Sequence, residues 1–255
     1  MSSSKKINIR QILSASAIAL AVGACSDGRE NAVTVGDHSY VFNGIEKANF
    51  TEVDQKRIIE LSQATADAVR AIMPELAPSI EFTYVMVDRD LSVVHGVSGR
   101  ADAPDEIEIS FSPSYAGGIQ QAINDGLKPT LFHELHHTVR GWTISGNKFG
   151  RGIDIAAVNE GLADVFAEEQ SHQATDEYPD DVNFDAWTKE ILALPKNADY
   201  GEWMFAHPDG REAIGYRTGA YIIKRAIKNS NKTVLELSKL PVDEIYRLAG
   251  YGMKE

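Results

Sequence analysis

A stretch near residue 130, PTLFHELHHTVRG, holds three of the chain's seven histidines within five positions. Leu131, Leu135 and Val139 recur every four residues, which is the spacing of a buried stripe on a helix. His133 and His137 have the same spacing, so a helix stacks their imidazoles on one face, where both can reach one metal ion. The fold must therefore bring a second element against this helix to complete such a site.

The ends of this helix and its second polar face can also be inferred from the sequence. Pro129 suits the first turn, Thr130 is a candidate cap, and Gly141 fits the position just past the last turn. Glu134 follows His133 directly and completes an HExxH pattern. It is turned by about 100° from the ligand face, where a carboxylate can touch a metal-bound water without binding the metal. This is the position of a general base.

A catalytic zinc takes three protein ligands and keeps a fourth position for water. The metzincin pattern would place a glycine and a histidine where this chain has Arg140 and Thr143, so that class is excluded. The segment AAVNEGLADVFAEE offers a glutamate instead: Glu160 follows His137 by 23 residues, and Asp164 lies four residues further on the same helical face. Glu160 can complete a His/His/Glu set, and Asp164 can accept the spare ring N–H of a ligand histidine.

Three segments, HELHHTVRG, NEGLADVFAEEQ and GYRTGAYIIKRA, together resemble the bacterial family of predicted zinc-dependent proteases typified by YjaZ-like proteins, within the gluzincins. The resemblance covers roughly residues 75–230. It implies a zincin-like fold and peptide hydrolysis, but no particular substrate. It also implies the same ligands, base and orienting carboxylate that the residues suggest: His133, His137, Glu160, Glu134 and Asp164.

Peptide hydrolysis by a metal-activated water passes through a tetrahedral oxyanion, which needs a second donor besides zinc. The segment GYRTGAYIIKRA offers Tyr216, Arg217 and Tyr221, and FAHPDG offers His207. We expect Tyr216, because it lies in the family-like segment between two glycines that permit close backbone approach. The alternative, an amphipathic helix that packs its tyrosines into the core, stays open.

The N-terminus has the outline of a secretory signal peptide, because basic residues precede an apolar run from Ile12 to Cys25. The run is shorter than the roughly 20 residues that cross a bilayer. Its end, VGAC, resembles the lipobox of bacterial lipoproteins, and Cys25 is the only cysteine, so no internal disulfide competes for it. We expect a signal peptide over 1–24, a tether over 25–37 and a metallopeptidase domain over 38–255. A cleaved signal with a chance cysteine is the alternative.

Charge limits the partners of the mature chain. Removal of the signal takes away three basic residues and no acidic ones, which changes the formal net charge from −12 to −15. Such a surface disfavours nucleic acid and anionic lipid headgroups, so we expect membrane contact through the lipid anchor only. Ser26 replaces the aspartate associated with inner-membrane retention, which favours the periplasmic face of the outer membrane. The sequence does not indicate an oligomeric state.

Periodicity predicts an α+β fold, with a small antiparallel or mixed sheet followed by the active-site helix and a mainly helical C-terminal half. Alternating apolar residues predict strands over 79–87 and 105–112. The second has a polar outer face, so we expect it at a sheet edge beside the site. Helices are expected over 51–73, 117–125, 128–140, 154–172, 184–193, 211–229 and, in two short pieces, 232–249.

Together these features predict a zinc metallopeptidase in which Glu134 takes the proton of the attacking water. Endopeptidase action is favoured, because the Gly-Met-Glu-Asn signature of zinc aminopeptidases is absent and an extended peptide can pair along an edge strand such as 105–111. Two alternatives stay open. One is a zinc-binding envelope lipoprotein without activity, which the intact Glu134 disfavours. The other is a metallohydrolase of a non-peptide amide or ester.

Overall fold

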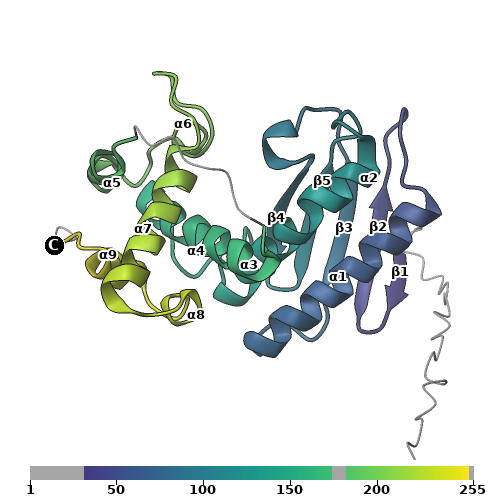
Figure 1. Ribbon diagram of the computed structural model, residues 1–255, viewed down its shortest axis with the longest axis horizontal. Coiled ribbons are helices and arrows are strands. Elements are labelled where there is room, and N and C mark those ends of the chain that lie inside the picture. Colours follow the sequence, from purple (N-terminus) through teal and green to yellow (C-terminus); the bar gives the residue numbers. More distant parts are fainter. Residues whose placement is uncertain (1–31, 174–181, 253–255) are drawn as a thin grey trace, which may run out of the picture.

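The structure of the chain, a computed structural model, describes residues 32–173 and 182–252 (Figure 1). The predicted signal peptide, residues 1–24, and the predicted lipidation site, Cys25, lie outside the described residues and stay predictions. Within the described residues, none of the helices combines the length and the apolar character needed to span a bilayer.

One mixed sheet of five strands forms the N-terminal half, in the order β1-β2-β3-β5-β4 (Figure 1). The three central strands, β2, β3 and β5, are parallel to one another, and the two outer strands pair antiparallel. The strands are β1 (Ala32–Val35), β2 (His38–Asn43), β3 (Glu81–Met86), β4 (Val97–Ala103) and β5 (Glu106–Phe111). The α+β prediction with a mixed sheet is confirmed.

Two features of the sheet differ from the sequence prediction. β5 pairs with β3 on one side and β4 on the other, so the expectation that residues 105–111 form a sheet edge is wrong. The sheet edge on this side is β4. Its sequence VSGRADA is too rich in small and polar residues to show an apolar alternation. In addition, β1 lies within residues 25–37, so the fold begins before the expected end of the tether.

The helices predicted from periodicity are present, together with the unpredicted helix α6 and a short 3₁₀ turn over Ser92–Val94. They are α1 (Glu52–Ile72), α2 (Gly118–Ala122), a π-helical turn (Ile123–Leu127), α3 (Lys128–Arg140), α4 (Ile153–Ser171), α5 (Phe184–Ala193), α6 (Tyr200–Met204), α7 (Ile214–Ser230), α8 (Val234–Leu237) and α9 (Val242–Leu248).

The histidine-bearing helix α3 begins differently from the prediction. It continues from the π-helical turn without a break, and the Thr130 hydroxyl donates to the carbonyl of Gly126 rather than capping an exposed end. Its end agrees with the prediction: Gly141 has φ 81°, and the N–H groups of Gly141 and Trp142 both donate to the carbonyl of His137. The left-handed glycine turns the chain back toward the metal-ligating face of α3.

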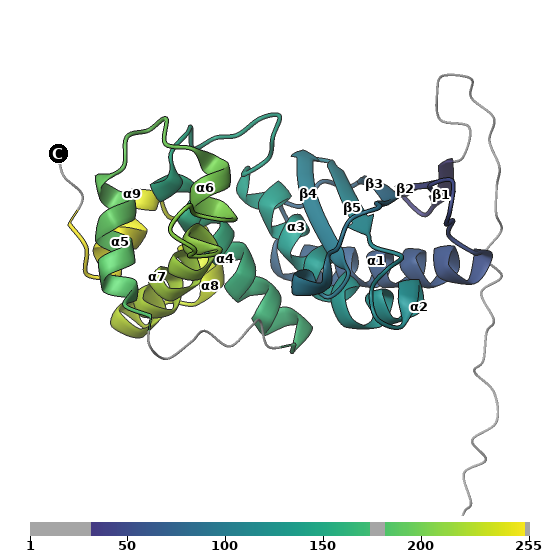
Figure 2. The same cartoon turned by 90° about the horizontal axis from the view of Figure 1, so that it is seen from above.

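Helices α1 and α3 contact each other and cover one face of the sheet, and α4 to α9 form a second, helical half beside β4 (Figure 2). α1 begins with a capping box formed by Thr51 and Asp54. Beneath it, Tyr40 of β2 stacks on Phe82 of β3 with ring centroids 5.5 Å apart, and Phe82 stacks on Tyr84 of the same strand with centroids 6.3 Å apart. Packing on this core sets the position of α3 relative to the sheet.

Helices α4 and α7 meet backbone to backbone. A Cβ on Gly219 would lie 1.9 Å from the carbonyl oxygen of Ala157, and a Cβ on Gly161 would lie 2.2 Å from the carbonyl carbon of Gly219. Only glycine at both positions allows this approach. The contact fixes two side chains of the candidate site, because Glu160 precedes Gly161 and Tyr216 lies one helical turn before Gly219.

We therefore predict that Gly219→Ala lowers the free energy of unfolding by about 1–3 kcal/mol or more, since backbone atoms cannot move aside as a flexible side chain would. In an unconstrained helix the same change would instead stabilise by roughly 0.5–1 kcal/mol. Urea denaturation followed by circular dichroism measures the difference. Gly252→Ala is the control, because its Cβ would meet nothing within 4 Å; equal midpoints for both variants and the wild type would contradict the packing argument.

Candidate metal centre

Helices α3 and α4 cross so that three polar side chains converge. His133 Nε2 and His137 Nε2 lie 2.8 Å apart, and each lies 3.1 Å from Oε2 of Glu160. His137 and Glu160 are buried, and His133 is partly buried. Two imidazoles and one carboxylate form a donor set that zinc prefers, with room for one further ligand. The structure thus brings the three predicted ligands together in a group that can bind a metal ion.

Two further side chains hold these donors in place. Asp164 Oδ1 lies 3.0 Å from His133 Nδ1, which leaves Nε2 of that ring for a metal. The indole N–H of Trp142 donates to Oε1 of Glu160 at 2.8 Å, which leaves Oε2 for a metal. The position of Asp164 agrees with the sequence prediction, whereas the contact of Trp142 depends on the turn at Gly141 and has no sequence signal.

The charges at this site are strongly coupled. Burial opposes ionisation of Glu160, but the charges of His137 and His133 and their hydrogen bonds to this carboxylate outweigh it and hold its pKa well below the usual range. Burial would lower the pKa of His133, but its bonds to Asp164 and Glu160 outweigh this and raise it well above 6.5. Metal ligation requires an unprotonated imidazole nitrogen, so binding of a cation here displaces protons and weakens as the pH falls.

Glu134 is buried against the edge strand. Its Oε2 has no hydrogen-bond partner among the described residues. A Cβ on Gly99 of β4 would lie 2.5 Å from Cγ and 2.6 Å from Oε1 of Glu134, so the glycine makes the space that the carboxylate occupies. Burial raises the pKa of Glu134, and the two neighbouring histidines oppose that rise. A buried carboxylate oxygen without a partner requires a ligand or a water, and a metal-bound water satisfies it.

The main chain of β4 is partly free beside this carboxylate. The Ser112 N–H donates to the carbonyl of Gly96, and bonded pairs alternate along an antiparallel ladder, so Gly99 directs its N–H and C=O away from β5. Two residues further, the carbonyl of Ala101 already accepts from the N–H of Ile144 at 3.0 Å. The free edge therefore ends where the segment after α3 crosses it.

Comparison with known proteins agrees with this donor set. The model of a family described as predicted Zn-dependent protease (DUF2268) matches residues 58–247. The chain belongs to this family of predicted zinc-dependent proteases. Its matched region contains both site helices and the predicted site residues of α7. No curated protein and no solved structure shows a significant match to the chain.

In this family member, Tyr216 lies in the first turn of α7, one turn before Gly219, whose backbone touches α4 at Ala157 and Gly161, close to Glu160 in the sequence. Burial raises its pKa, and the negative charges of Glu160, Asp164 and Glu134 raise it further, so the hydroxyl stays protonated and close to these groups. Tyr200 of α6, for which the sequence gives no signal, lies nearby, since the Phe205 ring contacts both tyrosine rings, with centroids 5.9 and 6.2 Å away.

Two of the other candidate donors, Tyr221 and His207, have partners elsewhere. Tyr221 stacks on Phe184 with ring centroids 5.2 Å apart, and its hydroxyl accepts from Arg225. His207 Nδ1 lies 2.8 Å from Asp209 Oδ1. These contacts fit structural roles for Tyr221 and His207.

His136, the third histidine of the HELHH segment, is not part of the site. It is fully buried, its Nε2 lies 2.8 Å from the Ser238 hydroxyl, and its ring packs 5.2 Å from that of Phe166. It therefore joins α3 to the end of α8 as a packing residue.

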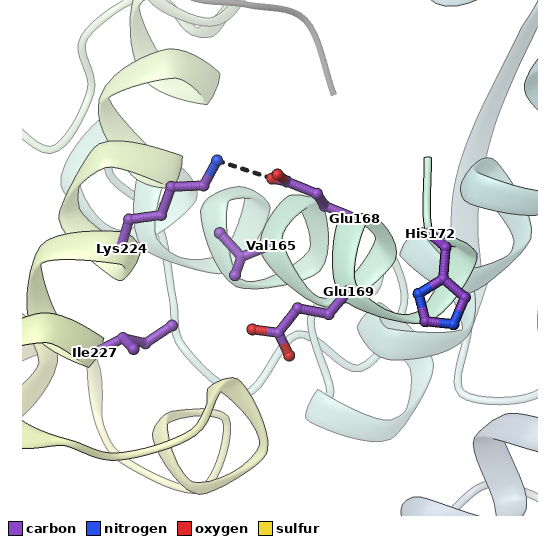
Figure 3. Close-up of a pocket in the computed structure, with 6 residues that line it drawn as sticks. All are labelled: Val165, Glu168, Glu169, His172, Lys224 and Ile227. Atoms are coloured by element: carbon purple, nitrogen blue, oxygen red, sulfur yellow. Dashed lines mark ion pairs between the residues drawn. The ribbon is translucent and has the colours of Figure 1, made fainter. Parts of the chain in front are cut away.

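A shallow cavity of about 470 Å³ lies at a different place, between the C-terminal part of α4 and α7 (Figure 3). Glu168 and Lys224 form an ion pair across it at 2.8 Å, and Glu169 and His172 line its other side. It contains none of the predicted site residues, so the metal centre and not this cavity is the candidate functional site.

We predict that Asp164→Asn weakens zinc binding by about 10–100-fold, because the amide no longer accepts strongly from His133 Nδ1 and the ring loses its fixed orientation. Competition with a chromogenic chelator measures the affinity. The matched control on the same helix is Glu169→Gln, which lies in the separate cavity and should bind zinc as the wild type does. Equal affinities for the two variants would show that Asp164 does not orient the ligand.

Proposed function

We propose that this chain is a gluzincin-type zinc peptidase, related to the YjaZ-like proteins, in which His133, His137 and Glu160 hold the metal. The observation that carries the proposal is the buried Glu134 carboxylate beside the His/His/Glu group, one oxygen of which has no hydrogen-bond partner in the described part of the chain. When bound, zinc lowers the pKa of its water to about 7 and polarises the substrate carbonyl. The family description supports the same reaction class.

In this mechanism Glu134 acts as the general base and then as the acid. Its carboxylate takes the proton of the attacking water and gives it to the leaving amine. Gly99 leaves the space in which the carboxylate lies against β4, since a Cβ at this position would overlap Cγ and Oε1 of Glu134. Burial raises the pKa of Glu134 toward neutral pH, which favours both uptake and release of the proton.

Tyr216 supplies the second oxyanion donor in this proposal. Its hydroxyl is kept protonated by burial and by the carboxylates nearby, so it is available to donate where negative charge develops. The packing of its ring against Phe205, with ring centroids 6.2 Å apart, restricts its rotation. The donor is thus oriented before substrate arrives.

An extended peptide can add to the sheet at the free edge of β4. The outward N–H and C=O of Gly99 lie beside the Glu134 side chain, so a peptide that pairs with them passes the metal centre. Pairing uses the main chain and does not require a free terminus, which favours an endopeptidase. The edge that serves this role is β4 and not the 105–111 strand expected from the sequence.

We predict that Glu134→Gln binds about one zinc per chain, as the wild type does, but no longer cleaves a denatured protein substrate, because the amide cannot take the water's proton. Metal content by mass spectrometry and the peptide digest are measured side by side on the domain from residue 26 onward.

The same experiment separates the alternatives. If both proteins hold zinc and the wild type cleaves esters but no peptide, the substrate is a non-peptide ester or amide. If the wild type cleaves nothing, the chain is a zinc-binding protein. Absence of zinc from both proteins would refute the metal centre itself.

Gly99→Ala tests the role of the edge strand. The new Cβ would overlap Cγ and Oε1 of Glu134, so we predict that kcat falls at least about 100-fold while zinc affinity changes little. Ala101→Gly, on the same strand and face, is the matched control and should retain activity. Wild-type kcat in Gly99→Ala would show that Glu134 is not held by β4.

A further inference from the structure

Three aromatic rings from the helical half meet beside the metal centre. Tyr200 begins α6, Phe205 directly follows α6, and Tyr216 lies in the first turn of α7. The Phe205 ring centroid lies 5.9 Å from that of Tyr200 and 6.2 Å from that of Tyr216. We call Tyr200, Phe205 and Tyr216 the aromatic rim.

The rim has a polar end and an apolar end. Tyr216 lies one helical turn before Gly219, whose backbone touches α4 at Ala157 and Gly161, on either side of Glu160 in the sequence, so this end lies toward the metal centre. The charges of Glu160 and Glu134, which raise the pKa of both tyrosines, agree with this placement. The other end is exposed, with Phe205 58% and Tyr200 42% accessible. In the part of the chain that the structure describes, seven large hydrophobic residues are exposed, and the two aromatic ones among them are these two. Exposed aromatic surface next to a polar site is typical of a binding surface.

α6 is docked firmly on α7. A Cβ on Gly215 would lie 2.0 Å from the Met204 sulfur, so the glycine provides the space into which Met204 packs. Met204 is fully buried, although α6 has only five residues. The position of Tyr200 relative to Tyr216 follows from this contact.

The loop that carries Phe205 is also fixed. The Ala213 N–H donates to the Phe205 carbonyl at 2.8 Å, and Ala206 pairs with Glu212. Beyond the turn, Arg211 binds both carboxylate oxygens of Glu190, at 2.7 and 3.0 Å. The loop that exposes Phe205 is therefore held closed by hydrogen bonds and an ion pair. A ligand that binds Phe205 would lose little free energy in ordering this loop.

The chemistry of the rim defines its occupant. Its three side chains carry no formal charge at neutral pH, so it attracts neither acidic nor basic side chains. A peptide that pairs with Gly99 of β4 carries its polar main chain past the metal centre, while its side chains project to either side. A large apolar side chain can then cover the exposed rings.

We propose that the aromatic rim is a substrate subsite that selects a large apolar residue, such as Leu, Met or Phe, next to the cleaved bond. This inference rests on the proposed peptidase function and adds the class of peptide that is cut.

The test has two steps. A mixture of synthetic peptides is digested with the zinc-loaded protein, and mass spectrometry of the products gives the residues on each side of every cleaved bond. Two peptides that differ only by Leu or Ala at the selected position are then compared. We expect the wild type to prefer Leu by at least about tenfold in kcat/KM, which corresponds to burial of roughly two methylene groups against the rim.

Phe205→Ala should reduce that Leu-to-Ala ratio toward one, while Phe205→Leu, which keeps an apolar side chain, should retain most of it. Val53→Ala removes an equally exposed apolar residue on α1 and should leave the ratio at the wild-type value. Zinc content and denaturation midpoints confirm that each variant is folded.

The outcomes are distinguishable. If the wild type cleaves peptides without preferring large apolar residues, or if Phe205→Ala keeps the wild-type ratio, the subsite is wrong and the peptidase function stands. If the zinc-loaded wild type cleaves no peptide, the proposed function fails and the subsite fails with it.

Discussion

The backbone contact between α4 and α7 is the constraint on which the candidate site depends. Gly161 and Gly219 let the two helices approach until main-chain atoms touch, which is closer than any pair of side chains would permit. One helix carries Glu160 and the other carries Tyr216, so the candidate metal ligand and the proposed hydroxyl donor are fixed relative to each other by the helix axes and not by loops. Rigid elements hold such groups more precisely than mobile ones do.

The site also contains more buried carboxylates than its two imidazoles can neutralise, and a bound cation would balance this negative charge. Glu134, Glu160 and Asp164 gather around His133 and His137 in a largely buried space. Buried carboxylates are costly unless they are paired, and two imidazoles can offset three of them only by taking up protons. A divalent ion supplies the missing positive charge and frees the imidazole nitrogens. The same cluster that is costly without a metal is thus matched to one.

The sequence predicts the parts of the site that depend on spacing within one helix. The four-residue steps from His133 to His137 and from Glu160 to Asp164 need only helical periodicity, and the structure places these residues together. The rest depends on contacts between distant segments. Gly99 matters because β4 crosses α3, and neither that crossing nor the strand itself has a periodic signal.

The same limit applies to the aromatic residues and to the sheet edge. Trp142 reaches Glu160 only because Gly141 reverses the chain, and Tyr200 reaches Tyr216 only because Met204 packs on Gly215. β5 shows the polar alternation of a half-exposed strand, yet it is interior, since strand order is a property of the whole sheet. Local pattern does not determine which neighbours a strand acquires.

The segment after α3 pairs with part of the β4 edge, and this has a consequence for association between molecules. An unpaired strand edge is a template on which another sheet can grow, and proteins limit this risk by shortening or covering such edges. Here the N–H groups of Ile144 and Ser145 donate to the carbonyls of Ala101 and Asp102, respectively. The uncovered edge around Gly99 is therefore only a few residues long. An edge of this length can hold one flexible peptide in passing, but it is too short to nucleate a ladder with the sheet of a second molecule.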